Sequence, residues 1–180
     1  MVARSPFRSV ITGGPGAGKS TLLDAAADAG LAVSPEVARD ILQAPGGMEL
    51  RERNPFGFAE AMLLQELAAF NNSSQYPAPV LFDRGFSDIA GFLQLEGLSV
   101  PAELDRICRE MRYEGPVFRA PPWREIYAQD AERIQDWEAA VASDAAVIAA
   151  WRHYGYGPVD LPLTSVEQRL KFITHRLNPA

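Results

Sequence analysis

The chain has 180 residues, of which 47 % are hydrophobic and 22 % charged, and this length and composition suit one folded domain with a substantial core. Its formal net charge of −6 argues against general nucleic-acid binding, because affinity for a phosphate backbone depends on clustered positive charge. No apolar run approaches the ~20 residues of a membrane helix, and the basic residues near the start precede no apolar segment of the signal-peptide kind. We therefore expect a cytoplasmic protein without nucleic-acid or membrane partners, and its oligomeric state stays open.

The first predicted elements surround a phosphate-binding motif. A short apolar strand over 7–12 is followed by Gly13-x-x-x-x-Gly18-Lys19-Ser20, which matches the P-loop pattern, and a helix is expected from about Lys19 to Gly30. Glycines let successive N–H groups point at phosphate oxygens, and the helix start adds the positive end of its dipole. Lys19 is expected to reach the phosphates, and the Ser20 hydroxyl to bind Mg²⁺. The expected nucleotide-binding residues are Gly13, Gly14, Pro15, Gly16, Ala17, Gly18, Lys19, Ser20 and Thr21.

A strand and two helices are predicted next. The strand covers 31–33, and Ser34 with the proline after it is typical of a helix start, with Ser34 as N-cap. That helix ends at the break over 44–47, and Asn54, again followed by proline, caps a longer helix. Glu36 follows the strand directly. Its carboxylate is either a functional group or a favourable partner of the helix dipole.

An apolar strand over 80–83 ends in a carboxylate, Asp83, followed by Arg84. Ligands of open α/β sheets lie at the carboxyl edge of the strands, where the P-loop also lies. Asp83 could bind Mg²⁺ through its hydration shell or take a proton from an acceptor hydroxyl, and the alternative is that it caps the next helix. Arg84 could bind acceptor or phosphate with its planar fork, and the alternative is an ion pair with Asp88.

The rest of the chain continues the alternation of strands and helices. The expected elements are a short helix around 89–93, a helix over 101–112, a strand over 115–119, a helical segment over 128–154 in two pieces that meet near Ser143 and Asp144, a strand over 159–162 and a helix over 165–177. One cysteine excludes an internal disulfide, and two histidines are too few for a transition-metal cluster. The alternation predicts a single P-loop NTPase domain over 1–180, with a five-stranded parallel sheet and helices on both faces.

Two classes of P-loop protein are disfavoured by the motifs after the loop. A switch-type GTPase should carry an Asn-Lys-x-Asp or Thr-Lys-x-Asp motif, and neither occurs. A ring-forming AAA+ motor normally ends the strand over 80–83 in Asp-Glu and needs more chain for its lid domain, whereas this strand ends in Asp83-Arg84. An acidic residue followed by arginine resembles the P-loop small-molecule kinases, such as thymidylate and deoxynucleoside kinases.

An ordered set of short motifs between residues 7 and 177 is similar to the NadR-like ATPase family, which includes the ribosylnicotinamide kinase domain of NadR. The matching residues are Thr12–Thr21, Pro35–Arg39, Leu81–Gly85, Asp88, Val117–Phe118, Pro121–Trp123, Ile126–Tyr127, Asp130–Arg133, Gly155–Tyr156, Val166–Glu167 and Arg169. The P-loop part is common to a large superfamily, and the ordered set is more specific. The resemblance implies the nucleoside/nucleotide-kinase type of this fold, with a small helical lid at about 119–142. Because many members of this family have no assigned substrate, the resemblance implies ATP handling more strongly than it implies any acceptor.

The resemblance also suggests residues around the acceptor. Similarity to nucleoside kinases places Glu36 near the acceptor hydroxyl, and Arg39, one turn on, either shares that site or pairs with Glu36. Arg133 is the candidate lid arginine that covers the transferring phosphate when the site closes. Arg119 and Arg124 flank the same segment and are weaker candidates.

The function expected from the sequence is an ATP- and Mg²⁺-dependent kinase that phosphorylates a hydroxyl of a small metabolite such as a nucleoside or riboside. Its partners are then a nucleoside triphosphate and a small-molecule acceptor. The sequence does not distinguish ATP from GTP as the donor, or Asp83 from Glu36 as the base. One alternative is a regulatory NTPase with slow hydrolysis and no acceptor, and another is a kinase-type toxin with a larger substrate. A kinase predicts a nucleoside-sized pocket lined by Glu36, Arg39 and Arg84, which a regulator could fill with side chains.

Overall fold

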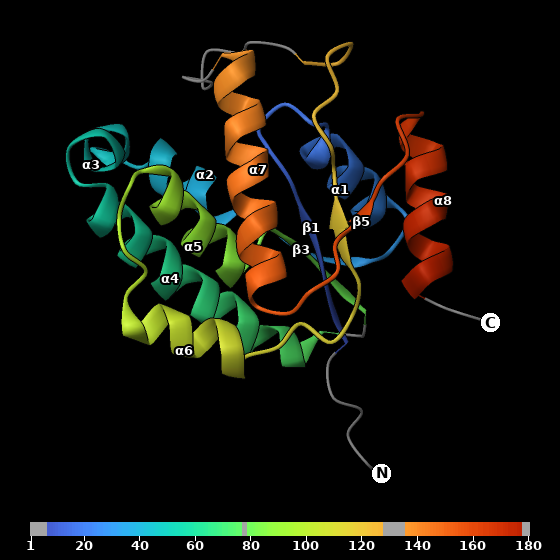
Figure 1. The fold of residues 1–180 in the computed structure, drawn as a ribbon. Coiled ribbons are helices and arrows are strands. Elements are labelled where there is room, and N and C mark those ends of the chain that lie inside the picture. The colour runs from blue at the N-terminus through green and yellow to red at the C-terminus, as the bar shows by residue number, and fades with distance from the viewer. Residues whose placement is uncertain (1–6, 77–78, 128–135, 178–180) are drawn as a thin grey trace.

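The computed structural model describes residues 7–76, 79–127 and 136–177, which form a parallel five-stranded sheet between two layers of helices (Figure 1). The strand order is β2-β3-β1-β4-β5, so the first strand lies in the centre. The strands are β1 Arg8–Thr12, β2 Ala32–Ser34, β3 Val80–Asp83, β4 Val117–Arg119 and β5 Val159–Asp160. The predicted α/β P-loop sheet is therefore confirmed.

The register of the sheet brings the predicted functional residues to one edge. Ile11 of β1 pairs with Asp83 of β3, and Thr12 pairs with Arg119 of β4. Ser34, at the end of β2, pairs with Phe82. Since all strands are parallel, the segments that follow β1, β2 and β3 leave the sheet at the same carboxyl edge.

Helices cover both faces of the sheet because strand residues alternate between two cores. Val10 and Phe82 face one core, and Ile11 and Leu81 face the other. The first core is covered by α4 Pro55–Asn72, α5 Phe86–Leu95, α6 Ala102–Glu110 and α7 Trp137–His153, and the second by α1 Lys19–Asp28 and α8 Val166–Leu177. Helices α5 and α7 run side by side, and α7 crosses the sheet in Figure 1.

Two short helices, α2 Val37–Gln43 and α3 Gly47–Arg53, pack against α4 near the carboxyl edge of the sheet. The sequence did not predict α3, which begins where Gly46, with a φ of 79°, turns the chain. The prediction of Ser34 as N-cap of α2 was wrong. Residues up to Ser34 stay extended to pair with β3, and Glu36 occupies the N-cap position.

The prediction of two helical pieces that meet near Ser143 and Asp144 was also wrong, because α7 is continuous through both residues. Asp144 is buried and paired with Arg119, so it lies inside the packed helix and does not break it. The part of the expected lid over 128–135 lies outside the described residues. At the predicted N-cap of α4, Asn54 Oδ1 accepts a hydrogen bond from Gly57 N at 2.9 Å.

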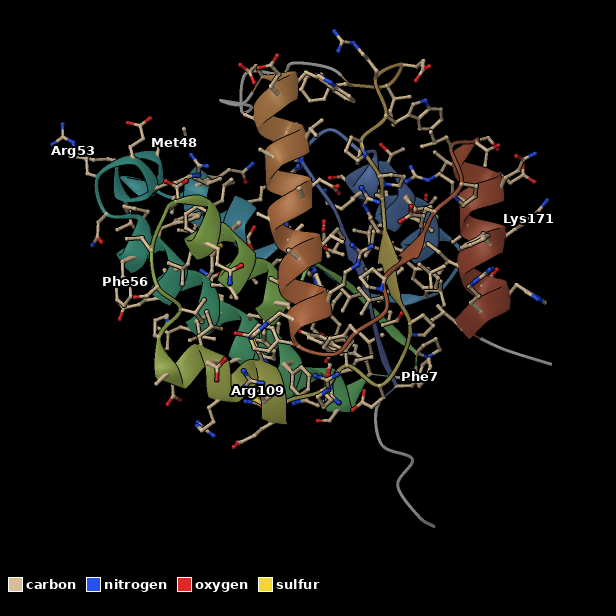
Figure 2. The ribbon with its side chains drawn as sticks, in the orientation of Figure 1. Phe7, Met48, Arg53, Phe56, Arg109 and Lys171 are labelled. Carbon is tan, nitrogen blue, oxygen red and sulfur yellow. The ribbon has the colours of Figure 1, made fainter. Side chains whose placement is uncertain are left out.

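Most long charged side chains lie on the outside of this fold. Figure 2 shows Arg53 and Lys171 extending away from the body of the molecule. Within the described part of the chain, no helix combines the length and apolar character needed to cross a bilayer.

Candidate active site

The loop between β1 and α1 has the backbone of a phosphate cradle. Gly13, Gly16 and Gly18 have φ angles of 131°, 75° and 77°, which residues with a Cβ rarely adopt. Lys19 is buried behind the loop, and its ammonium group donates hydrogen bonds to the carbonyl oxygens of Gly13 and Gly14 at 3.1 and 2.7 Å. Burial, with the nearby Arg84 charge, lowers the Lys19 pKa to about 8. A phosphate would supply the negative charge that this buried cation favours.

Helix α7 holds the start of this loop in place. Asp144 Oδ1 accepts a hydrogen bond from Gly14 N at 3.3 Å, and Arg119 binds the same carboxylate at 2.7 Å. A Cβ on Gly14 would lie 2.5 Å from Ala140 O, so only glycine permits this approach. Arg119, expected as a weak ligand candidate, thus pairs with Asp144 and also with Asp160. No sequence pattern indicated a role for Asp144 other than an expected helix break.

A second arginine supports the loop from α8. The Arg169 side chain is buried, and its Nη1 donates to Ala17 O at 3.2 Å. A Cβ on Gly18 would lie 3.0 Å from this nitrogen. Burial lowers the pKa of Arg169. The loop is therefore packed between α7 and α8, which fixes its position relative to the sheet.

Asp83 lies at the end of β3, beside the loop, and has the features of a ligand for a hard cation. The residue is buried, and its Oδ1 accepts no hydrogen bond from any residue that the structure describes. Burial, with the negative charge of Glu36, raises the Asp83 pKa to about 6. The alternative role as helix cap goes to Asp88, which accepts the hydrogen bond from Gly85 N. Carboxylate and hydroxyl oxygens are ligands that Mg²⁺ prefers, so Asp83 and Ser20 fit the ion expected here.

Arg84 connects the end of β3 to the loop and to α2. Its Nε donates to Glu36 Oε1 at 2.7 Å, and its Nη1 donates to Gly13 O at 3.0 Å and to Asp88 Oδ1 at 3.3 Å. The backbone has a φ of 72°, an uncommon conformation for a non-glycine residue, while its N–H donates to Ile11 O at 2.9 Å. The structure therefore contains both the ion pair with Asp88 and a contact with the predicted acceptor residue.

Asp88 holds this arrangement in place. The sequence indicated Asp88 as part of the family motif and as an ion-pair partner of Arg84. Its carboxylate is buried and accepts hydrogen bonds from the Thr12 hydroxyl, from Gly85 N at 3.0 Å and from Trp151 Nε1 at 2.9 Å, besides Arg84. Burial raises the pKa of Asp88, while these donors and Arg84 oppose that shift. Thr12 of β1 and Trp151 of α7 hold the carboxylate from two other elements, so Asp88 positions Arg84.

Glu36 and Arg39 extend from the start of α2 toward the loop. Burial raises the Glu36 pKa, but the positive charges of Arg84 and Lys19 outweigh it, and the net shift is downward. Glu36 is therefore held ionised. Arg39 Nη2 donates a hydrogen bond to Ser20 Oγ at 3.4 Å, which joins α2 to the phosphate loop.

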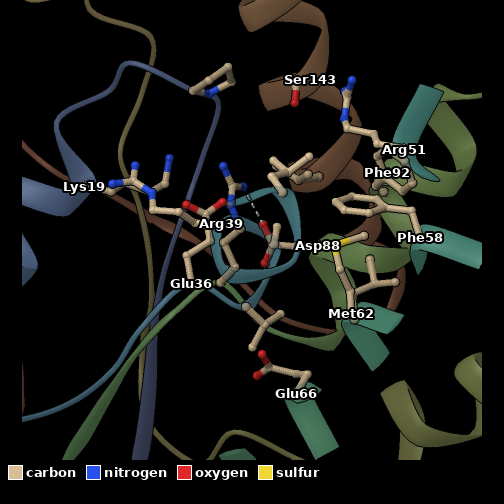
Figure 3. A pocket seen from close by; sticks show the side chains of 18 of the residues that line it. Lys19, Glu36, Arg39, Arg51, Phe58, Met62, Glu66, Asp88, Phe92 and Ser143 are labelled. Carbon is tan, nitrogen blue, oxygen red and sulfur yellow. Dashed lines mark hydrogen bonds and ion pairs between the residues drawn. The ribbon is translucent and has the colours of Figure 1, made fainter. Parts of the chain in front are cut away.

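A pocket of about 480 Å³ opens beside these residues (Figure 3). At one end it is polar, where Lys19, Ser20, Glu36, Arg39 and Arg84 line it. Its walls are apolar and come mainly from α2, α3, α4, α5 and α7; among them are Leu42, Met48, Phe58, Met62, Ile89, Phe92 and Val147. A ligand pocket of ~300–1,000 Å³ is typical for small molecules. Its lining thus contains the Glu36, Arg39 and Arg84 side chains expected of an acceptor site.

The pocket lining also includes polar residues that no sequence motif indicated, among them Glu66. Glu66 of α4 lines it beyond Met62, and Figure 3 shows both side chains on the same helix. Its Oε1 accepts a hydrogen bond from the Tyr113 hydroxyl at 2.7 Å. Burial raises the Glu66 pKa to about 8, although the Tyr113 bond acts in the opposite direction. An amphipathic helix gives no sequence signal that one of its glutamates is buried.

The remaining candidates lie away from this pocket or beyond the described chain. Arg133, the expected lid arginine, lies outside the described residues. Arg124 is exposed, with its guanidinium 5.2 Å from the centre of the Trp137 ring. The structure therefore gives Arg124 a contact with an aromatic side chain at the start of α7.

Comparison with known proteins agrees with this geometry. A family model described as an AAA domain matches residues 8–169, and no curated protein sequence matches the chain. A solved structure of deoxyadenosine kinase from M. mycoides, with dCMP and dCDP bound, has a TM-score of 0.69 at 14 % identity and covers 96 % of this chain and 100 % of its own. The same kinase with dATP bound gives similar values.

NadR in complex with NR is also similar, with a TM-score of 0.74 at 17 % identity. That match covers 97 % of this chain but 52 % of the NadR chain, so this chain spans about half of NadR. At such identities the likeness concerns the fold, and it confirms the predicted P-loop fold of nucleoside-kinase type. Because the family model extends from β1 into α8, the chain belongs to that AAA domain family and is a P-loop NTPase with a kinase-like fold.

Proposed function

We propose that this protein is an ATP- and Mg²⁺-dependent kinase that transfers the γ-phosphoryl group to a hydroxyl of a nucleoside or another riboside. The pocket carries this proposal, because its volume of about 480 Å³ extends from the phosphate loop to an apolar chamber. Glu36 and Arg84 lie where the two parts meet. A regulatory NTPase needs no such chamber, so the open acceptor side favours a kinase.

The donor side of the reaction is assigned to the loop. Its N–H groups and Lys19 bind the triphosphate, and Ser20 and Asp83 hold Mg²⁺, which neutralises charge on the phosphates when bound. When the triphosphate binds, the Lys19 ammonium group would donate hydrogen bonds to phosphate oxygens in place of the carbonyl oxygens of Gly13 and Gly14. Buried between loop and sheet, Lys19 experiences little screening, so its charge acts strongly on the phosphates.

On the acceptor side, we assign the base to Glu36 and not to Asp83. Glu36 lines the pocket, whereas Asp83 does not. The pKa of Glu36 is also lowered by Arg84 and Lys19, so it is ionised at neutral pH, while burial raises that of Asp83. An ionised carboxylate in the pocket can orient the acceptor hydroxyl and accept its proton.

Arg84 is assigned to the transferred phosphate. Its guanidinium lies between Glu36 and Gly13 O, the boundary between acceptor and donor sides. Phosphoryl transfer depends mainly on positioning and on stabilising negative charge, which a planar guanidinium held by two carboxylates supplies. Arg39, bonded to Ser20, is a second cation at the same boundary.

The proposal is tested by following ADP or GDP release with ATP or GTP, Mg²⁺ and a panel of acceptors. The panel contains ribonucleosides, deoxyribonucleosides and NR, the ligand of the NadR structure. We expect at least one acceptor to raise turnover by about tenfold or more above the acceptor-free rate. Lys19→Ala should abolish this stimulation, and Lys171→Ala, on the outer face of α8, should keep it. Turnover in the wild-type protein that no acceptor accelerates would favour the regulatory NTPase.

A further inference from the structure

Glu66 is the most buried of the polar side chains of the acceptor pocket that the proposed transfer step does not use. It lies on α4 with 2 % of its surface exposed, on the same helix as the pocket residues Phe58 and Met62. Among the described residues, its one hydrogen bond is that between Oε1 and the Tyr113 hydroxyl. Its second oxygen is thus available to a pocket ligand.

The Tyr113 hydroxyl takes part in two hydrogen bonds. Tyr113 Oη accepts a hydrogen bond from Phe86 N at 3.3 Å and donates its own proton to Glu66 Oε1 at 2.7 Å. Glu66 Oε1 is therefore an acceptor in this bond. When the carboxyl group is protonated, the proton lies on Oε2, and the group offers a donor to the pocket.

The surroundings of Glu66 favour the protonated form. The charged groups that act on it are Asp88 of α5 and Asp83 of β3, both negative, together with the neutral Tyr113 hydroxyl. No lysine or arginine of the described residues bonds to it. With burial, these carboxylates raise the Glu66 pKa to about 8, so the side chain is mostly neutral at pH 7.

The apolar part of the pocket that contains Phe58 and Phe92 suits a flat ring. Phe58 and Phe92 meet edge to face with ring centres 5.5 Å apart, and Ile89 and Val147 also line the pocket. In Figure 3, Ser143 lies at the top of the view and Glu66 at the bottom, and Phe58 and Phe92 lie at heights between these two residues. A riboside whose hydroxyl is at Glu36 would place its base against these apolar side chains.

We propose that Glu66 determines acceptor specificity by donating a hydrogen bond to a carbonyl oxygen on the edge of the acceptor's base. This inference rests on the proposed kinase function and names the acceptor class: nucleosides with an oxo group, in preference to those with an amino group at the same position. An amino group would face a second donor, and a buried donor without an acceptor costs binding energy. Ionised Glu66 would reverse the preference, because it offers only acceptors.

The test compares matched nucleoside pairs by calorimetry at pH 6.5, with Mg²⁺ and a non-hydrolysable ATP analogue present. The pairs are inosine with adenosine and uridine with cytidine, each differing in oxo against amino. We expect the wild-type protein to bind the oxo member of at least one pair about tenfold more tightly. At pH 8 this preference should shrink, because about half of the Glu66 carboxyl groups are then ionised.

Two variants separate recognition from a purely structural role. In Glu66→Gln the amide oxygen can still accept from Tyr113 and the NH₂ group can donate to the base, so the oxo preference should persist at both pH values. Glu66→Leu should remove the oxo preference at both pH values. Glu60→Gln, an exposed site on the same helix, is the matched control and should behave as the wild type.

Equal affinities within both pairs, an amino preference at pH 6.5, or an oxo preference that survives in Glu66→Leu would overturn the inference. Phosphorylation of each nucleoside is measured in parallel samples that contain ATP in place of the analogue. If nucleosides are phosphorylated without oxo preference, the Glu66 inference fails and the kinase function stands. If the protein neither binds nor phosphorylates any nucleoside or NR, both fail.

Discussion

Arg84 Nε lies 2.7 Å from Glu36 Oε1, across 48 residues of sequence. The contact joins the end of β3 to the start of α2, and the same guanidinium binds the Gly13 carbonyl of the phosphate loop. A single side chain therefore links the proposed acceptor base to the donor site. This relationship accounts for the left-handed backbone of Arg84, whose cost the three side-chain contacts offset.

The first prediction concerns the geometry of that link. In Arg84→Lys, one ammonium group cannot replace a fork that binds Glu36, Gly13 and Asp88 together. We expect kcat/KM to fall by about 100-fold or more and the free energy of unfolding to fall by about 1–3 kcal/mol. Steady-state kinetics and urea denaturation measure both. Arg106→Lys, at an exposed ion-paired site on α6, is the control, and an Arg84→Lys enzyme with its activity unchanged would refute the assigned role.

A second prediction distinguishes the two carboxylates. Glu36→Gln keeps the shape of the side chain but removes its charge, so kcat should fall by about 10²–10⁴-fold while triphosphate affinity stays within about threefold. Kinetics and calorimetry give the two values. Asp83→Asn should instead raise the Mg²⁺ concentration needed for half-maximal turnover. The assignment would be reversed if Asp83→Asn abolished transfer at saturating Mg²⁺ and Glu36→Gln kept it.

The close packing of the loop against α7 gives a third prediction. In Gly14→Ala the new Cβ would lie 2.5 Å from Ala140 O, and backbone cannot yield as a flexible side chain does. We expect a loss of about 1–3 kcal/mol in the free energy of unfolding together with weaker triphosphate binding. Gly157→Ala is the control, because a Cβ there meets nothing within 4 Å. Equal stability of the two variants would show that the loop is not packed as described.

A fourth prediction uses the raised pKa of Glu66. Burial raises the Glu66 pKa from 4.5 in the unfolded chain to about 8 in the folded protein. Below pH 4.5 the carboxyl group is protonated in both the folded and the unfolded protein. Between pH 4.5 and 8 only the unfolded chain releases the proton. The wild-type protein therefore loses stability as the pH rises from 4.5 to 8, and Glu66→Gln lacks this loss. In urea denaturation the variant should gain on the order of 2–4 kcal/mol relative to the wild type between pH 5 and 8. A difference that does not change with pH would contradict the buried, neutral Glu66.

Those parts of the fold that local patterns determine were predicted from the sequence. The P-loop, the apolar strand that ends in Asp83 and the cap at Asn54 each depend on a few adjacent residues, and the structure has the strand and the cap at those positions. The continuous α7 was not predicted, because the burial of Asp144 depends on Arg119, which lies 25 residues away. Likewise, Ser34 is extended because of its pairing with β3.

The candidate site was predicted only in part, for the same reason. Glu36 and Arg84 were singled out by motif, but their contact joins two separate elements and no spacing rule predicts it. Asp88 and Glu66 have their roles through Trp151 and Tyr113, which come from distant parts of the chain. Side chains that act through long-range partners become visible only in the folded structure.

The most direct test of the kinase account is mass spectrometry of the acceptor after incubation with the protein, Mg²⁺ and a triphosphate labelled at its γ-phosphate with ¹⁸O. We predict a riboside product heavier by one labelled phosphoryl group, formed by the wild-type protein and by Lys171→Ala but not by Lys19→Ala. Labelled inorganic phosphate alone, with every nucleoside and NR recovered unchanged, would contradict the account.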